Sequence, residues 1–84
     1  MAAIPDLPLG DLSEAELAAL VYRITDELTR RGSTESFSEL LKLVGSVGER
    51  VGEAARLLAA SNSWSQVAQV SGTSKQAAWE RWRT

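Results

Sequence analysis

The chain has 84 residues, 44% of them hydrophobic and 24% charged, with a formal net charge of −2 at pH 7, which is the composition of one small globular domain. It contains neither cysteine nor histidine, and this excludes disulfide bonds, thiol nucleophiles, Cys/His zinc sites and imidazole acid–base chemistry. Because cysteine is absent and no apolar run approaches the roughly 20 residues that span a bilayer, we expect a cytoplasmic protein without a membrane segment. We also expect no metal, no cofactor and no small-molecule ligand.

Residues 1–12 are expected to form an irregular arm, because they contain both prolines and Gly10. The arm has no basic stretch ahead of its apolar residues, which argues against a signal peptide. A helix is predicted over residues 13–31, with Ser13 and Glu16 spaced as a capping box at its start and Gly32 placed to end it. Its apolar face repeats at helical spacing and consists of Leu17, Leu20, Val21, Ile24 and Leu28.

A second, longer helix is predicted over residues 36–60. Ser36 and Glu39 have the spacing of a capping box at its start. The apolar residues that follow keep an a/d heptad pattern over three heptads. The pattern consists of Phe37, Leu40, Val44, Val47, Val51, Ala54 and Leu58, and we call this set the α-helical seam.

Three glycines interrupt the same stretch: Gly45, Gly48 and Gly52. Each costs about 1 kcal/mol relative to alanine in a helix interior. They leave two interpretations, a break into two helices near residues 45–48 or one helix whose glycines let a partner backbone approach closely. We favour one helix, because the heptad phase runs through the glycines without a slip.

A helix of this length, about 37 Å at 1.5 Å per residue, is too long to bury its seam against the helix over residues 13–31 alone. We therefore predict a homodimer in which both longer helices pack on their twins and the seam is the interface, since small chains rarely build a sufficient core by themselves. The alternative is a monomeric bundle in which the first helix and the C-terminal segments cover the seam.

Two short helices are predicted at the C-terminus, over residues 63–70 and 74–83, with serine caps and a glycine turn between them. The inward-facing candidates are Trp64, Val67, Ala68, Ala77, Ala78 and Trp82. All segments together predict an all-α fold in one compact domain. It would comprise the arm, a helical dimerisation region over residues 13–60 and a helical hairpin over residues 61–84.

The hairpin resembles the helix-turn-helix of bacterial DNA-binding proteins, and more narrowly the C-terminal ends of small regulators that are common in actinobacteria. The matching residues are Ser63, Trp64, Val67, Ala68, Gly72, Ser74, Lys75, Gln76, Ala77, Ala78, Arg81 and Trp82. Ala68 stands where the motif needs a small residue at the helix crossing, and Gly72 stands at the turn. The resemblance implies a homodimeric transcriptional regulator that binds double-stranded DNA, with the last helix in the major groove.

The resemblance and the local charge together imply a set of DNA contacts. The expected contact residues are Ser63, Thr73, Ser74, Lys75, Gln76, Trp79, Arg81 and Arg83. Gln76 can pair with adenine N6 and N7, and Lys75 can donate to guanine or to a phosphate. Trp79 is expected to contact a thymine methyl group, a sugar or a partner helix, with packing against its own chain as the alternative.

Charge is unevenly distributed along the chain. Residues 1–55 hold five basic and ten acidic residues, whereas residues 56–84 hold four basic and one acidic residue, so a polyanion would meet the C-terminal third. Two other functions stay open: a protein-interaction module that uses the acidic part, and an accessory DNA-binding factor of a phage or plasmid. An enzyme is not expected, because carboxylates such as Asp26 and Glu27 have the spacing of solvated helix surfaces and no phosphate-binding glycine loop is present.

Overall fold

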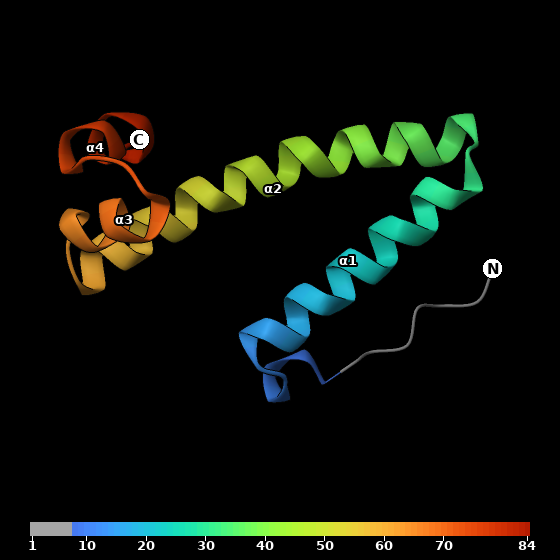
Figure 1. Cartoon of the computed structure of the whole chain (residues 1–84), viewed down its shortest axis with the longest axis horizontal. Helices are drawn as coiled ribbons and strands as arrows, with labels where there is room; N and C mark the ends of the chain where they lie inside the picture. The colour runs from blue at the N-terminus through green and yellow to red at the C-terminus, as the bar shows by residue number, and fades with distance from the viewer. Residues whose placement is uncertain (1–7) are drawn as a thin grey trace. The chain divides into compact units, whose positions relative to one another are not determined.

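The computed structural model describes residues 8–84 and confirms the all-α fold class. A single 3-10 turn, η1 (Leu9–Asp11), precedes two longer helices, α1 (Glu14–Arg31) and α2 (Thr34–Ser61). Two short helices, α3 (Trp64–Ser71) and α4 (Lys75–Trp82), follow and contact each other (Figure 1). None of the helices in the described part of the chain is long and apolar enough to cross a membrane.

The described chain divides into two compact units, Met1–Leu40 and Leu41–Thr84, and the boundary between them lies within α2. The irregular arm predicted over residues 1–12 can be compared with the structure only from residue 8 onward, because residues 1–7 lie outside the described residues. Its last part is more regular than predicted, since η1 closes with a hydrogen bond from the Leu12 N–H to the Leu9 carbonyl, 3.1 Å long.

The start of α1 is the predicted capping box. The Glu16 N–H donates to Ser13 Oγ (3.1 Å), and the Ser13 N–H donates to Glu16 Oε1 (2.9 Å). The second of these bonds lowers the pKa of Glu16 below its ordinary value, because it stabilises the ionised carboxylate. Gly32 ends the helix in the left-handed conformation with φ 57°. Both ends of α1 are therefore set by local hydrogen bonds and backbone conformation.

The α2 helix is continuous over Thr34–Ser61, so the alternative of two helices broken near residues 45–48 is wrong. The helix begins two residues before the predicted start at about residue 36, and the predicted capping box of Ser36 and Glu39 at its start is wrong. The Ser36 N–H donates to Ser33 Oγ (3.0 Å) and the Ser33 N–H donates to Ser36 Oγ (3.1 Å), which places the reciprocal cap three residues earlier than the predicted Ser36–Glu39 box. Two serine hydroxyls thus perform the role that a serine and a glutamate perform at the start of α1.

The core of the unit Leu41–Thr84 lies where α3 and α4 meet the C-terminal part of α2. Its buried residues are Ala55, Val67, Ala68 and Ala78, and Leu58, Ala59, Trp64 and Trp82 pack against them. The prediction that Ala77 faces inward is wrong, because Ala77 is exposed whereas its neighbour Ala78 is 0% exposed. A helix this short can bury a single narrow stripe, and the crossing with α3 selects Ala78 for that position.

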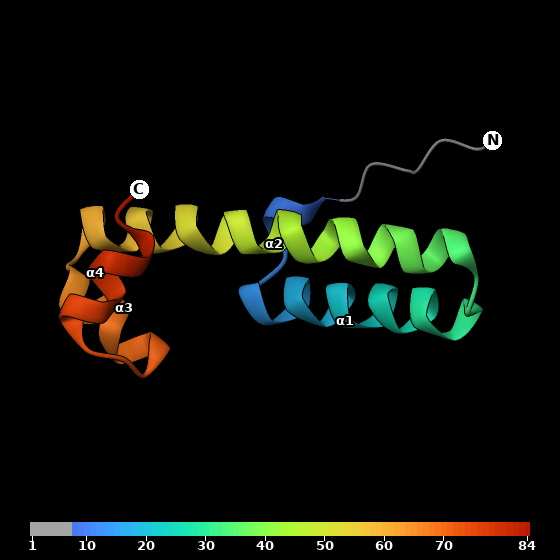
Figure 2. The ribbon, with the colours of Figure 1, turned by 90° about the horizontal axis from the view of Figure 1, so that it is seen from above.

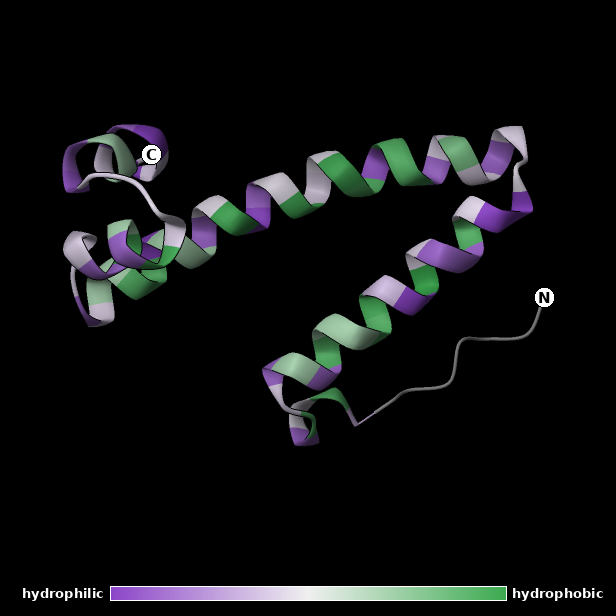
Figure 3. Ribbon diagram, in the orientation of Figure 1, coloured by the Kyte–Doolittle hydropathy of each residue, from purple (hydrophilic) through white to green (hydrophobic). Residues whose placement is uncertain are grey.

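Most large apolar side chains of α2 lie outside this core. Figure 3 shows hydrophobic residues recurring along α2 between hydrophilic ones. In the unit Leu41–Thr84, Val44 is 73% exposed and Val51 is 47% exposed, and in the unit Met1–Leu40, Phe37 is 63% exposed. Within their own units, these members of the seam are therefore exposed.

Replacing Gly72 with alanine should destabilise the unit Leu41–Thr84, whereas the same replacement at Gly45 should stabilise it. Gly72 has φ 71°, a conformation that costs a residue with a Cβ atom about 1 kcal/mol. Gly45 lies within α2 with open space around an added methyl group, so alanine gains about 1 kcal/mol of helix propensity there. Thermal unfolding, followed by circular dichroism, measures the change in stability that each replacement causes. Equal effects at the two glycines would contradict the assigned turn.

Candidate nucleic-acid interface

The α3–α4 hairpin is held in shape by its turn and by small residues at its crossing. The N–H groups of Gly72 and Thr73 both donate to the Ala68 carbonyl, the latter over 3.0 Å, and close the end of α3. Val67 and Ala68 on α3 and Ala78 on α4 are buried, and the two alanines allow the helices to approach closely. Figures 1 and 2 show α3 and α4 side by side next to the last turns of α2.

A long-range contact anchors α4 on α2. The Arg56 guanidinium donates to the Trp82 carbonyl at the end of α4 over 3.0 Å. A methyl group added at Gly52 would lie 3.8 Å from the Trp82 ring and 3.3 Å from the Arg56 guanidinium, so the glycine makes room for both. The sequence predicted Gly52 as a close-approach site for a partner backbone, and in this chain a side chain of α4 occupies that space.

One face of α4 carries three polar or aromatic side chains of the predicted contact set. Gln76, Trp79 and Arg83 are spaced three and four residues apart and all are exposed, with the Trp79 indole 40% exposed. The Arg83 guanidinium lies 4.6 Å from the centre of the Trp79 ring, a cation–π contact. Gln76 Nε2 donates to Glu80 Oε1 over 2.9 Å. This bond uses one amide N–H, so the other N–H and Oε1 can still bond to a base.

Lys75 lies at the edge of this face, next to a hollow between the two helices. The hollow has a volume of about 570 Å³ and is lined by Trp64, Lys75, Gln76 and Trp79. Trp64 was predicted to point inward, and it does pack against the core while it also borders this hollow. The hollow is therefore lined by an aromatic side chain of α3 and by three residues from the first five of α4.

The remaining predicted contact residues have different surroundings. Ser63 Oγ accepts from the Gln66 N–H (3.0 Å) and Ser74 Oγ accepts from the Ala77 N–H (3.1 Å), so each caps its helix. Both hydroxyl hydrogens remain available for a phosphate. Thr73 is exposed at the turn. Arg81 lies over the Trp82 ring at 4.9 Å, away from the face that carries Gln76 and Trp79.

The two units differ strongly in charge. The unit Met1–Leu40 has three basic and eight acidic residues, and the unit Leu41–Thr84 has six basic and three acidic residues. The hairpin itself, residues 64–84, contains three basic residues and a single acidic one, Glu80. The hairpin therefore has an excess of basic residues, and its one acidic side chain, Glu80, is bonded to Gln76.

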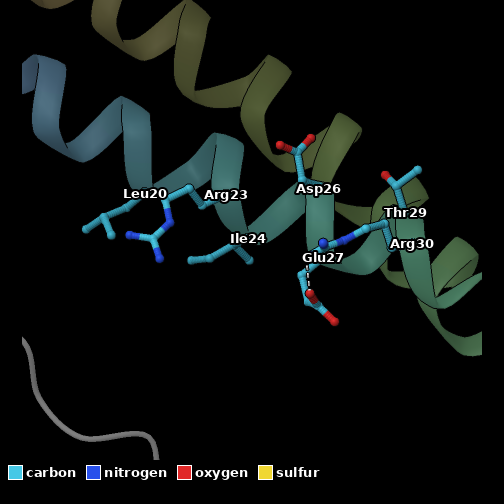
Figure 4. A pocket seen from close by; sticks show the side chains of 7 residues that line it. All are labelled: Leu20, Arg23, Ile24, Asp26, Glu27, Thr29 and Arg30. Atoms are coloured by element: carbon cyan, nitrogen blue, oxygen red, sulfur yellow. Dashed lines mark hydrogen bonds and ion pairs between the residues drawn. The ribbon is translucent and has the colours of Figure 1, made fainter.

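A second hollow, of about 680 Å³, lies on α1 alone (Figure 4). Two of its charged members, Glu27 and Arg30, are paired with each other, and Glu27 also accepts a hydrogen bond from Arg31, which lies outside the hollow. The Arg31 hydrogen bond and the Arg30 charge lower the pKa of Glu27, which disfavours a proton-transfer role near neutral pH. This surface has the properties of a solvated helix face stabilised by ion pairs.

Sequence reasoning missed three contacts of the interface, two within α4 and one between α2 and α4. The pairs Gln76–Glu80 and Trp79–Arg83 are each four residues apart on one helix, a spacing that brings side chains into contact, so both were readable in advance. The anchor from Arg56 to Trp82 spans 26 residues, and no local pattern indicates it.

No family model, curated protein or solved structure matches this chain.

Proposed function

We propose that the protein is a sequence-specific double-stranded DNA-binding regulator that acts through its α3–α4 hairpin. The observation that carries the proposal is the outward face of α4, where Gln76, Trp79 and Arg83 lie together on a helix whose opposite side packs on α3 through Ala78. Side chains able to bond to base edges and side chains able to bond to phosphates thus occur on the same short helix. The positive charge of the hairpin supports the same partner.

In this proposal α4 enters the major groove with its N-terminal end toward the bases, and α3 crosses the phosphate backbone. Gln76 accepts from adenine N6 through Oε1 and donates to adenine N7 through the N–H that Glu80 does not use. Lys75 donates to guanine or to a phosphate, and Ser63 and Ser74 donate to phosphates beside the two helix N-termini. Arg83 approaches a phosphate and also supports the Trp79 ring.

The first test is a titration of the full chain with mixed-sequence duplex DNA at two salt concentrations, followed by tryptophan fluorescence. All three tryptophans, Trp64, Trp79 and Trp82, lie in or beside the hairpin, so binding there should change the emission. The proposal expects a change whose midpoint weakens as salt rises, because phosphate contacts release counterions. A folded protein that shows no change at low salt would refute DNA binding.

We further propose that the protein binds DNA as a homodimer paired through α2. The exposed Val44 and Val51 belong to an apolar face that continues into a groove of about 200 Å³ between α2 and α3, which includes Val67 and Val70. Each such side chain gains about 1.5–3 kcal/mol on full burial. The hairpin alone offers few phosphate contacts, so a second copy would double them.

A second copy fits this face in an antiparallel arrangement centred between Val44 and Val47. Each Val44 then meets Val47 of the second copy, and both of these side chains are at least half exposed in the single chain. Because α4 is anchored near Gly52 and Arg56, the two anchor points would lie roughly 20–32 Å apart along the pair at 1.5 Å per residue. The upper end of this range is close to the roughly 34 Å of one DNA turn.

Single nitroxide labels at a cysteine introduced by Ala60→Cys test this arrangement, and the chain has no native cysteine to interfere. Residue 60 lies near the C-terminal end of α2. Distance measurement between labels by pulsed electron resonance should give roughly 45 Å for the antiparallel pair and roughly 10–20 Å for a parallel pair. A short distance, or a monomer by sedimentation at micromolar concentration, would refute the antiparallel dimer.

A protein-interaction module is the competing function, and exposed apolar residues on the acidic α1 favour it. Val21, Tyr22 and Ile24 are all more than half exposed on that helix. A partner that binds there would not depend on the charges of α4. The charge reversal described in the Discussion therefore separates the two functions.

A further inference from the structure

The hollow beside α4 is bordered by two indole rings, Trp64 from α3 and Trp79 from α4, which the DNA contacts proposed above do not use. Its other lining residues, Lys75 and Gln76, belong to those contacts. The hollow has a volume of about 570 Å³ and is open to solvent. An apolar group of modest size can therefore enter between the rings while polar atoms next to it meet Lys75 and Gln76.

The exposure of Trp79 needs a physical reason. An indole that is 40% exposed on a short surface helix is costly unless it gains a contact. The Arg83 guanidinium lies 4.6 Å from the ring centre, which orients the indole and adds a positive charge beside it. Lys75 adds a second positive charge at the hollow. The occupant should accordingly be apolar in itself and attached to an anionic polymer.

The polar atoms at the hollow restrict which apolar group of the DNA can occupy it. The Gln76 amide is oriented by Glu80 over 2.9 Å, and its free Oε1 and N–H match the N6 and N7 atoms of adenine in the major groove. The single apolar group that a base pair presents in that groove is the C5-methyl group of thymine. A deoxyribose is also apolar in part, but it lies on the backbone, away from the base edge that Gln76 would contact.

We infer that the hollow between Trp64 and Trp79 receives the C5-methyl group of a thymine next to the adenine that Gln76 contacts. This inference rests on the proposed DNA binding and assigns part of its sequence preference to Trp79. Burying one methyl group corresponds to about a 4-fold change in affinity. In a homodimer that uses two such hollows, this change in affinity would apply once at each hollow.

The experiment first selects preferred duplexes from a random-sequence library with the full chain, and then rebuilds the best duplex with deoxyuridine in place of thymidine. This exchange removes every C5-methyl group and leaves the protein unaltered. We expect binding to weaken at least about 4-fold, and we expect single exchanges to locate the effect at the position beside the selected adenine. Equal affinity for the two duplexes would overturn the inference.

The variant Trp79→Ala completes the test on the same two duplexes, with circular dichroism to verify that the hairpin remains folded. We expect the variant to bind both duplexes alike, because the group that senses the methyl is gone. A variant that weakens both duplexes and keeps the 4-fold difference would place Trp79 on a sugar or phosphate and overturn the inference. Failure of the wild-type chain to bind any duplex would instead refute the proposed DNA binding itself.

Discussion

Reversing the charges of Lys75 and Arg83 together, as Lys75→Glu/Arg83→Glu, should lower the affinity for mixed-sequence duplex DNA by roughly 100-fold or more. Each lost contact is worth about 1–3 kcal/mol, and the two new carboxylates repel phosphates. Both side chains are exposed near the ends of α4, so the fold should survive. The tryptophan titration at two salt concentrations measures the loss, and the salt dependence should become shallower.

The matched control reverses two exposed cations elsewhere, as Arg23→Glu/Lys42→Glu. It changes the net charge by the same amount but leaves the hairpin intact, since Arg23 lies on α1 and Lys42 lies on α2. We expect this control to bind DNA within a few-fold of the wild-type chain, because neither Arg23 nor Lys42 belongs to the α3–α4 hairpin that the proposal places on DNA. Equal losses in the two variants would assign binding to overall charge and contradict a DNA interface on α4.

Replacing Ala78 with leucine should destabilise the unit Leu41–Thr84 by about 1–3 kcal/mol or more, because it forces extra methylene groups into a packed crossing. Ala78 is 0% exposed, within the core formed with Val67 and Ala68. Separation of α3 from α4 would also remove the surface that orients Gln76. The variant should therefore lose thermal stability and DNA affinity together, which unfolding by circular dichroism and the tryptophan titration can follow.

Ala77→Leu provides the control at the next position. Ala77 is exposed on the same helix, and leucine and alanine have similar helix propensities. We expect its stability to stay within about 0.5 kcal/mol of the wild-type chain, as for most surface substitutions. If both leucines were equally harmful, or equally harmless, the assigned face of α4 would be wrong.

Much of the local structure was determined by the sequence alone. Ser13 with Glu16, Ser63 and Ser74 begin their helices as predicted, and Gly32 and Gly72 end theirs. These signals depend on hydrogen bonds and backbone angles within about four residues, so the sequence contains everything that decides them. The continuity of α2 was also predicted from the sequence, because the heptad pattern runs through its glycines without a slip.

The tertiary structure decided which side chains are buried and which helix covers them. The local pattern allowed both Ala77 and Ala78 to face inward, and only the crossing of α4 with α3 buries Ala78 and leaves Ala77 in solvent. The sequence likewise marked Gly52 as a site of close approach, but the identity of its neighbour, Trp82 held by Arg56, depends on residues 26 positions apart. Helix periodicity fixes which residues share a face, whereas the element that covers that face is chosen by packing among segments distant in the chain.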